Sequence, residues 1–549
     1  MELSCVVVVP ARDEQLRIGA CLAALAEQTV PSGTFETIVV VDDCHDATEQ
    51  AAHASAAALG LQLRTLPGPG RGAGAARRAG MDAAAARLLA LGLTEGVIAC
   101  TDADSRPAPD WLERQLAHVG RGARAIAGLI ELDPDELIGL PDRVLSRRER
   151  NAAQRLSRVR RIDPAADHHH FAGASIAVTA AVYRDVGGLE ALTELEDAAF
   201  AARLQDHAIP ILRPSDVRVR TSARAAGRVK RGLSVDLDVS IWSERRRYRA
   251  SEFDPELLAG RKGATTVSVI IPTKNCAETI EGVVSGTVRP LAELGLVDQL
   301  VVVDAGSRDG TARIASAAGA RALQQDELLP DRGPALGKGD AMWRSLLATD
   351  GDVVCFLDGD TRNPQPRHLQ GLLGPMLTDA SVQLVKGAFD RPLQSGIEQL
   401  AHEGGRVTEL MARPLLNLHE PRLAGFAQPL AGEFAARRSL LEAIPFPVGY
   451  GVEIAVLIDA LRLRGLDALA ECHLGSRQNR HQPLRALGEM AYAVLAAVER
   501  RLGGERSTIS GSYLRPWDDG AVAAVPVLER PPIAGLDGHR RTGRRPSVV

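Results

Sequence analysis

Three segments of the sequence occur twice, in the same order and with similar spacing. Each is a run of aliphatic residues that ends in a polar loop. Pro10 precedes Asp42 by the same 32 residues that separate Pro272 from Asp304. Two independent segments in one register indicate an internal duplication, so the chain is predicted to contain two related halves. The matching segments are CVVVVPARDE at 5–14 and VSVIIPTKNC at 267–276, IVVVDDCHDAT at 38–48 and LVVVDAGSRDGT at 300–311, and ACTDADSRPAPDWL at 99–112 and FLDGDTRNPQPRHL at 356–369.

Each repeated segment predicts a β-strand that is followed by a loop and a helix. The residues after the first aliphatic run have helical spacing, as Ile18, Leu22 and Leu25 illustrate. Alternation of strand and helix is typical of a mostly parallel sheet with helices on both faces, and ligands bind at the carboxyl ends of such strands. We therefore expect an α/β fold with two domains of this kind, each with its own cleft.

The expected domain boundaries follow from where this pattern stops. We expect the first domain over residues 1–235 and the second over 266–503. The segment 236–265 interrupts the strand pattern and is predicted to be a linker. The end of the chain, 504–549, is rich in Pro, Gly and Arg and is predicted to be a disordered tail.

Composition and charge exclude several classes of function. Lys and Arg total 65 against 69 Asp and Glu, a net charge of −4 that gives no electrostatic reason to bind nucleic acid. The seven cysteines contain no Cys-x-x-Cys pair, which argues against a zinc site or a disulfide framework and favours a reducing, cytoplasmic location. No apolar stretch reaches the roughly 18 residues of a membrane span, so no transmembrane segment is expected.

The third repeated segment carries two carboxylates one residue apart in each half. Asp102 and Asp104 follow a predicted buried strand in the first half, as Asp358 and Asp360 do in the second. Such carboxylates can hold a hard divalent cation, Mg2+ or Mn2+, whose charge offsets that of a leaving nucleoside diphosphate. We therefore predict a metal site in each half.

Asp42 and Asp304 end the second repeated strand of each half. Their carboxylates could accept hydrogen bonds from a nucleotide base, or they could cap the helix that follows. Both interpretations stay open.

The first half resembles the family 2 glycosyltransferases over about residues 3–233. The resemblance rests on Pro10-Ala11-Arg12-Asp13-Glu14, Val41-Asp42-Asp43 and Thr101-Asp102-Ala103-Asp104. Members of that family have the GT-A (nucleotide-diphospho-sugar transferase) fold and use nucleotide sugars with Mg2+ or Mn2+. The resemblance therefore implies an inverting transfer in which the Glu196-Asp197 pair supplies the general base, with Asp197 preferred. The donor contacts that it implies are Pro10, Arg12, Glu14, Asp42 and Asp43.

The second half resembles the glucosyl-3-phosphoglycerate synthase family along roughly 240 residues. The resemblance implies a retaining, metal-dependent GT-A enzyme that moves glucose from UDP-glucose, or another nucleotide-diphosphate glucose, to the 2-hydroxyl of 3-phosphoglycerate. The motifs that carry it are GPALGKGDAMWRSL at 333–346, LDGD at 357–360, QLVKGAFDRPL at 383–393, GGRVTELMARPLL at 404–416, QPLAGEF at 428–434 and GYGVEIAVLIDA at 449–460.

The same resemblance implies roles for individual residues of the second half. Lys338, between two glycines, would meet the donor diphosphate, and Glu453 would be the catalytic carboxylate near the sugar. Arg406 and Thr408 would bind a small phosphorylated and carboxylated acceptor. In full, the implied donor contacts are Pro272, Thr273, Lys274, Asp304 and Lys338, the acceptor contacts are Arg406, Val407, Thr408, Arg477 and His481, and the metal ligands are Asp358, Asp360 and Asn479.

Three positions of the second half depart from the synthase pattern, all on the donor side. Cys276 replaces a Glu that contacts the nucleoside, Ala305 replaces a small hydroxyl residue, and Asn479 replaces a metal-binding His. Asn can still ligate a hard cation through oxygen, so we expect altered or weakened donor use rather than loss of activity. The alternative is that only the N-terminal half is catalytic and the C-terminal half is a degenerate scaffold or a nucleotide-sugar-binding regulatory domain.

Overall fold

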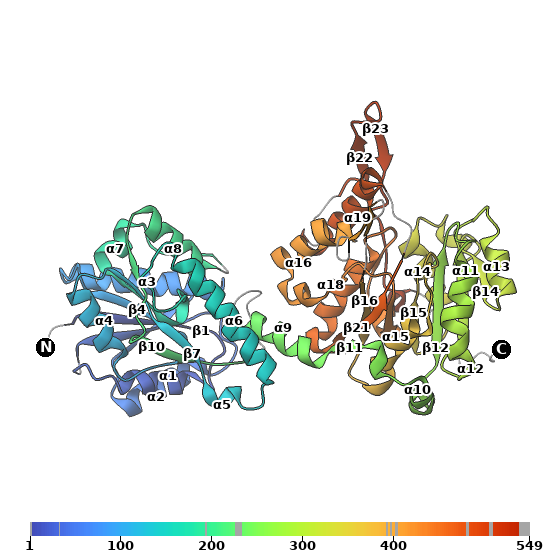
Figure 1. Ribbon diagram of the computed structural model, residues 1–549. Helices are drawn as coiled ribbons and strands as arrows, with labels where there is room; N and C mark the ends of the chain where they lie inside the picture. The colour runs from blue at the N-terminus through green and yellow to red at the C-terminus, as the bar shows by residue number, and fades with distance from the viewer. Residues whose placement is uncertain are drawn as a thin grey trace. The chain divides into compact units, whose positions relative to one another are not determined.

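The computed structural model describes residues 3–31, 33–192, 195–224, 233–390, 405–478, 483–503 and 509–536, and the backbone of two short strands within 391–400. The chain divides into two compact units, Met1–Leu237 and Asp238–Val549 (Figure 1). Each unit contains one large sheet with helices on both faces, so the predicted α/β class with mostly parallel, helix-flanked sheets is confirmed.

A seven-stranded sheet forms the centre of the first unit. In spatial order its strands are β3 (Leu63–Pro67), β2 (Phe35–Val41), β1 (Cys5–Ala11), β4 (Val97–Cys100), β8 (Ile176–Thr179), β6 (Ala125–Ala127) and β9 (Ile211–Leu212). The first four are parallel, and β8 runs antiparallel to both of its neighbours. A smaller sheet consists of β5 (Ser105–Pro107), β10 (Arg218–Thr221) and β7 (Leu129–Leu132).

Helices cover both faces of this sheet. They are α1 (Ile18–Ala26), α2 (Thr48–Leu59), α3 (Ala73–Ala90), α4 (Trp111–Gly120), α5 (Pro134–Leu137), α6 (Asp142–Val159), α7 (Ala180–Asp185) and α8 (Glu196–Asp206). Successive residues of a strand point to opposite faces. Accordingly, Val6 and Val8 of β1 pack with α3, α7 and α8, whereas Cys5, Val7 and Val9 pack with α1, α2 and α4. In Figure 1, α7 and α8 lie above the strands and α1 and α2 below them.

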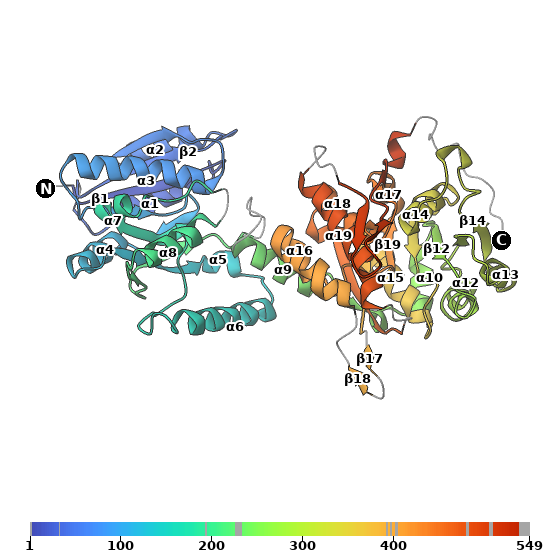
Figure 2. The same ribbon diagram turned by 90° about the horizontal axis from the view of Figure 1, so that it is seen from above.

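The second unit has an eight-stranded sheet of the same kind. In spatial order its strands are β11 (Arg247–Arg249), β21 (Leu469–Ser476), β16 (Leu384–Asp390), β19 (Phe434–Arg437), β15 (Val353–Phe356), β12 (Val267–Thr273), β13 (Gln299–Asp304) and β14 (Arg321–Gln324). Only β19 runs antiparallel to its neighbours in this sheet. Among the described residues, three short two-stranded sheets accompany it. They are β17 (Leu393–Ser395) with β18 (Glu398–Leu400), β20 (Phe446–Pro447) with β24 (Glu529–Arg530), and β22 (Ser512–Arg515) with β23 (Ala521–Ala524). The pair of β17 and β18 projects from the second unit in Figure 2.

The helices of the second unit also form two layers. They are α9 (Leu233–Arg245), which starts before the boundary, α10 (Pro255–Lys262), α11 (Ile280–Gly282), α12 (Arg289–Glu293), α13 (Thr311–Ala317), α14 (Lys338–Leu347), α15 (Pro366–Thr378), α16 (Arg413–His419), α17 (Arg438–Glu442), α18 (Val452–Arg464) and α19 (Leu484–Gly503). Ile270 of β12 packs with α14, α16, α18 and α19, whereas Val269 and Ile271 pack with α10, α11, α12 and α15.

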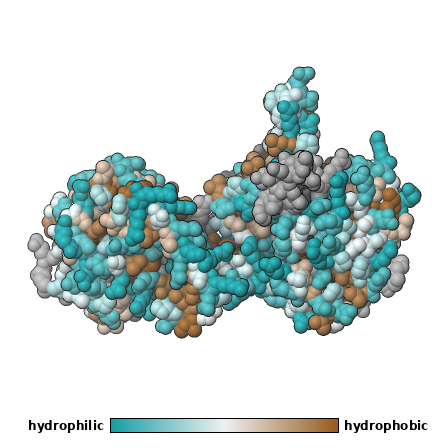
Figure 3. Space-filling model, in the orientation of Figure 1, coloured by the Kyte–Doolittle hydropathy of each residue, from teal (hydrophilic) through white to brown (hydrophobic). Residues whose placement is uncertain are grey.

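Hydrophilic residues dominate the face of the molecule that Figure 3 shows. Among the helices that the structure describes, none combines the length and the apolar character needed to cross a membrane.

The segment 236–265, which we expected to be a linker, differs from that expectation because it packs into the second unit. Its strand β11 pairs with β21 at the edge of the sheet. The indole of Trp242 is 2% exposed and donates to the Leu469 carbonyl at 2.7 Å. Buried side chains such as Trp242 and Phe253 therefore anchor this segment in the cores of the second unit.

The end of the chain also differs from the expected disordered tail over residues 509–536. The strands β22 and β23 form a hairpin, and β24 pairs with β20. Val525 and Ile533 are buried, and Ile533 belongs to the core that contains α14 and α18. Apolar residues spaced among the prolines and glycines therefore anchor this stretch. Residues 504–508 and 537–549 lie outside the described residues.

This packing predicts a stability effect that a tail would not show. Ile533→Ala should lower the free energy of unfolding by about 2–5 kcal/mol, because it leaves a cavity at a fully buried site. Leu528→Ala is the matched control: Leu528 is 62% exposed, and the change should cost less than about 0.5 kcal/mol. Urea unfolding of both variants measures the difference. Equal, small effects would contradict the packing of this segment.

Candidate active sites

A buried arginine joins two predicted site residues in the first unit. Arg77 lies on α3, and its side chain is 4% exposed. Its Nη1 is 3.1 Å from Asp102, which follows β4, and its Nε is 3.3 Å from Glu196, the first residue of α8. Burial alone would lower the pKa of Arg77, but the two carboxylates raise it. The cluster therefore holds two carboxylates close together inside the unit.

A second arginine spans the other predicted donor and metal residues of this unit. Arg224 follows β10, and its Nη2 is 2.6 Å from Glu14 and 2.9 Å from Asp104. Burial and the neighbouring Asp102 raise the pKa of Asp104 to about 6, although Arg224 opposes this shift. Glu14, Asp104 and the loop after β10 therefore meet at the carboxyl ends of the strands. The ion pairs of Arg77 and Arg224 were not predicted from the sequence.

The remaining predicted residues of the first unit take different positions. The Asp42 carboxylate is buried and accepts hydrogen bonds from the Gly70 and Gly72 amides at 2.7 and 3.1 Å, so here it caps the loop before α3. Pro10 is buried in β1. Arg12 forms an exposed ion pair with Asp43 at 2.9 Å. Asp197 is half-buried and accepts from the Ala198 amide, whereas its neighbour Glu196 joins the cluster of Arg77.

In the second unit a lysine lies between two carboxylates, as Arg77 does in the first unit. Lys338 begins α14, and its Nζ is 2.7 Å from Asp358, which follows β15, and 2.7 Å from Glu453 near the start of α18. Burial alone would raise the pKa of Asp358, but Lys338 and Arg477 hold it well below its usual value. Burial alone would lower the pKa of Lys338, and the two carboxylates raise it instead. The structure thus brings together one predicted donor contact, one predicted metal ligand and one predicted catalytic acid.

Arg477 completes this cluster from the end of β21. Its Nη2 is 3.0 Å from Asp358 and 3.5 Å from Asp360, its Nη1 contacts Glu433, and its guanidinium lies 5.0 Å from the centre of the Phe389 ring. Among the described residues, no partner is found for its buried Nε. Arg477 therefore faces the acid pair directly.

The loops after the first two strands correspond between the units. The Glu14 amide donates to Thr48 Oγ1 at 2.7 Å, and the Cys276 amide donates to Thr311 Oγ1 at 2.9 Å. Cys276 therefore occupies the position of Glu14 without its carboxylate. Asp304 is buried like Asp42 and accepts from the Ser307 amide at 2.9 Å.

Other predicted residues of the second unit are placed as follows. Val407 and Thr408 are buried and Arg406 is half-buried at the start of a helical turn. Thr273 is buried, Pro272 half-buried and Lys274 exposed. His481 and Asn479 lie outside the described residues.

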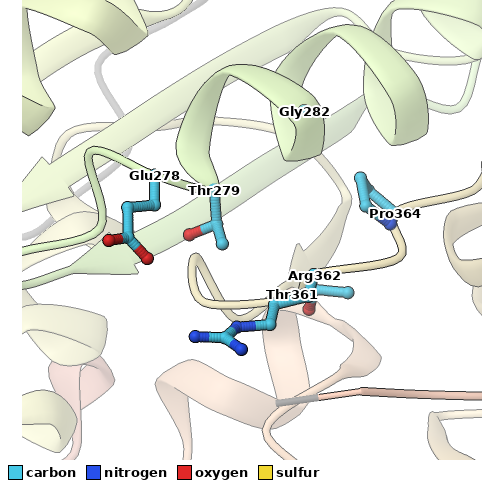
Figure 4. Close-up of a pocket in the computed structure, with 6 residues that line it drawn as sticks. All are labelled: Glu278, Thr279, Gly282, Thr361, Arg362 and Pro364. Atoms are coloured by element: carbon cyan, nitrogen blue, oxygen red, sulfur yellow. The ribbon is translucent and has the colours of Figure 1, made fainter. Parts of the chain in front are cut away.

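A polar pocket lies beside the acid pair of the second unit. Figure 4 shows Thr361 and Arg362, which follow Asp360, opposite Glu278 and Thr279, which precede α11. Thr279 Oγ1 donates to the Gly359 carbonyl at 2.7 Å. This contact fixes the loop between Asp358 and Asp360. The pocket is lined by Glu278, Thr279, Gly282, Thr361, Arg362 and Pro364.

The donor atoms of the two acid pairs are of the type that binds a hard divalent cation. Asp358 and Asp360 offer carboxylate oxygens, and both face the guanidinium of Arg477. Asp102 and Asp104 offer the same donors in the first unit. Oxygen ligands of this kind suit Mg2+ or Mn2+.

Comparison with known proteins agrees with this duplicated design. The family model of glycosyl transferase family 2 matches residues 6–179 and 268–423. Glucosyl-3-phosphoglycerate synthase from Mycolicibacterium smegmatis is 44% identical over 282 residues, which are 51% of this chain and 92% of that protein. The protein of the same name from Mycobacterium tuberculosis is 44% identical over 287 residues, 50% of this chain and 87% of that protein.

Two solved structures are also similar to this chain. A mannosyl-3-phosphoglycerate synthase from Rubrobacter xylanophilus is 44% identical and covers 53% of this chain and 98% of its own, with a TM-score of 0.49. A glucosyl-3-phosphoglycerate synthase from M. tuberculosis with Mn2+, UDP-glucose and phosphoglyceric acid is 42% identical and covers 51% and 95%, with a TM-score of 0.47. From the family match and the two sequence relatives, the chain belongs to glycosyl transferase family 2 and, over about half of its length, to the glucosyl-3-phosphoglycerate synthase family.

Proposed function

We propose that the second half transfers glucose from a nucleotide-diphosphate glucose, with UDP-glucose as the leading donor, to 3-phosphoglycerate. The observation that carries the proposal is the 44% identity to a glucosyl-3-phosphoglycerate synthase across 92% of that protein. The motifs that resemble that family lie in the second half, where Lys338, Asp358 and Glu453 meet.

The donor side of this cleft is built around Asp358. Asp358 and Asp360, with Asn479, would hold Mg2+ or Mn2+, which when bound offsets the charge of the leaving diphosphate. Lys338 keeps Asp358 ionised, and it orients both Asp358 and Glu453 because its ammonium lies 2.7 Å from each. Glu453 is then the interior carboxylate next to the transferred sugar. Pro272, Thr273, Lys274 and Asp304 remain the proposed donor contacts of the neighbouring loops.

The acceptor side needs cationic donors for a phosphate and a carboxylate. We propose Arg406, Val407 and Thr408 at the helical turn and His481 as acceptor contacts, with Arg406 supplying a guanidinium. Arg477 contributes through its Nε, because its other nitrogens contact Asp358, Asp360 and Glu433. It would thereby link the acceptor to the metal ligands.

The first half is proposed to be an inverting glycosyltransferase with its own donor and acceptor. Asp102 and Asp104 would hold its cation, and Pro10, Arg12, Glu14, Asp42 and Asp43 would contact its donor. Asp197 stays the preferred general base, with Glu196 second because Arg77 pairs with it. A carboxylate that is not paired with a guanidinium accepts a proton more readily than one that is.

The alternative, in which the second half is a degenerate scaffold or regulatory domain, is not favoured. A domain without function could exchange this buried charge cluster for apolar residues, because such a replacement is often neutral or stabilising. Lys338, Asp358, Glu453 and Arg477 nevertheless form a matched set. We also propose a cytoplasmic location, supported by seven free cysteines.

Independent clefts predict separable losses of activity. Asp358→Ala should reduce formation of glucosyl-3-phosphoglycerate at least about 100-fold, because several kcal/mol of charge stabilisation are lost. Asp102→Ala, the matched control in the other half, should leave this product unchanged. Excess EDTA should abolish the reaction and Mg2+ or Mn2+ restore it. Mass spectrometry of the products measures all three. Full activity in EDTA, or loss of product in a folded Asp102→Ala variant, would contradict the account.

The departures on the donor side predict weak donor binding that can be improved. A carboxylate that binds a nucleoside hydroxyl contributes about 1.5–3 kcal/mol. Cys276→Glu with Asn479→His should therefore tighten UDP-glucose binding about 10- to 100-fold in calorimetric titration. Cys276→Gln is the uncharged control and should gain less. Unchanged affinity in the double variant would favour the scaffold alternative.

The ion cluster predicts a pH-dependent stability loss in Lys338→Met. The depressed pKa of Asp358 stabilises the folded state above its unfolded pKa of about 4, and this contribution is lost as the pH falls towards the folded pKa. The free energy of unfolding of the variant should therefore be lower than that of the wild type by about 3 kcal/mol at pH 7 and by less at pH 3. Lys274→Met, at an exposed lysine, is the control. A loss that is constant with pH, measured by urea unfolding, would contradict the role of Lys338.

A further inference from the structure

The segment 525–536, here called the C-terminal segment, packs beside the loop that presents Lys338. Its strand β24 pairs with β20, with Arg530 opposite Phe446 and Glu529 opposite Pro447. The Val448 amide extends this pairing by donating to the Leu528 carbonyl at 3.0 Å. The segment therefore adds a strand to one side of β20.

The other side of β20 touches the start of α14. A Cβ on Gly339 would lie 1.9 Å from the Pro447 carbonyl oxygen, and one on Gly337 would lie 2.8 Å from that of Val448. The Asp340 amide donates to the Val448 carbonyl at 3.2 Å. No side chain fits between these backbones, so β20 sets the position of the turn on which Lys338 lies.

Arg530 of the C-terminal segment binds this turn directly. Its Nε and Nη2 are 2.8 and 2.9 Å from the two oxygens of Asp340, whose side chain is fully buried. Asp340 also accepts from the Leu336 amide at 2.9 Å and pairs with the buried Arg344. Arg344 in turn donates to the Gly333 carbonyl at 2.7 Å. Both arginines and the loop 333–337 are therefore joined through one buried carboxylate.

A second contact holds the same helix. The Trp343 indole donates to the Pro531 carbonyl at 2.9 Å, and the Arg530 guanidinium lies 5.6 Å from the centre of its ring. The C-terminal segment thus binds α14 at two successive points. Lys338 is only two residues from Asp340.

We propose that Arg530 is a positioning residue of the second cleft: by closing the buried Asp340–Arg344 network, it fixes the start of α14 so that Lys338 meets Asp358 and Glu453. The structural part of this inference stands on the contacts above, and its catalytic consequence rests on the proposed glucosyl transfer. Misplacement of a catalytic group by about 1 Å costs up to roughly 100-fold in rate.

The test compares three full-length variants. Arg530→Met removes the charge, and Arg530→Lys keeps a charge without the two-point contact. Arg515→Met is the matched control, because Arg515 forms an ion pair with Glu489 within the preceding hairpin and α19. Hydrogen exchange at residues 333–341 reports the loop, and kcat and KM for UDP-glucose and 3-phosphoglycerate report the cleft.

We expect Arg530→Met to speed exchange at 333–341 about tenfold and to lower kcat/KM for UDP-glucose about 10- to 100-fold. The KM for 3-phosphoglycerate should change less than about twofold, Arg530→Lys should be intermediate, and Arg515→Met should resemble the wild type. Unchanged exchange in Arg530→Met, or equal losses in Arg530→Met and Arg515→Met, would overturn the inference. A wild-type chain that makes no product would instead contradict the proposed function, because exchange still reports the positioning.

Discussion

A buried cation between two carboxylates is the interaction on which both clefts depend. Arg77 lies between Asp102 and Glu196, and Lys338 lies between Asp358 and Glu453. Each cluster joins the end of a central strand to the starts of two helices. Charges removed from water must be paired, so these elements are held at a fixed mutual distance. The strand ends and helix starts place the acids, and the cation between them offsets their negative charge.

The two halves satisfy this constraint in different ways. Lys338 is the first residue of α14, whereas Arg77 comes one turn inside α3, where its longer side chain reaches the equivalent point. The donor loops differ as well. Glu14 pairs with Arg224, but Cys276 at the corresponding position offers no carboxylate. The two halves therefore share the charge cluster and differ in the loop after the first strand of each sheet, which agrees with the proposal that they use different donors.

Local patterns in the sequence predicted the features that are local in the structure. Aliphatic runs that end in Asp predicted the strands and the acid pairs. Lys338, which the resemblance implied to meet the donor diphosphate, lies 2.7 Å from Asp358. Contacts between distant residues could not be found in this way. Arg224 and Glu14 are 210 residues apart, and Arg530 and Asp340 are 190 apart. The prolines and arginines near the end suggested disorder, because composition does not reveal that a buried carboxylate elsewhere requires a partner.

The stereochemistry of the product tests the central claim that the Lys338 cluster is the centre of a retaining glucosyl transfer. The full chain, UDP-glucose labelled with carbon-13 at the anomeric position, Mn2+ and 3-phosphoglycerate would be followed by nuclear magnetic resonance. The account predicts an α-linked glucose on the 2-hydroxyl of 3-phosphoglycerate, because the donor linkage is α and is retained. A β-linked product, or the same α-linked product from a folded Lys338→Met variant at an unchanged rate, would contradict it.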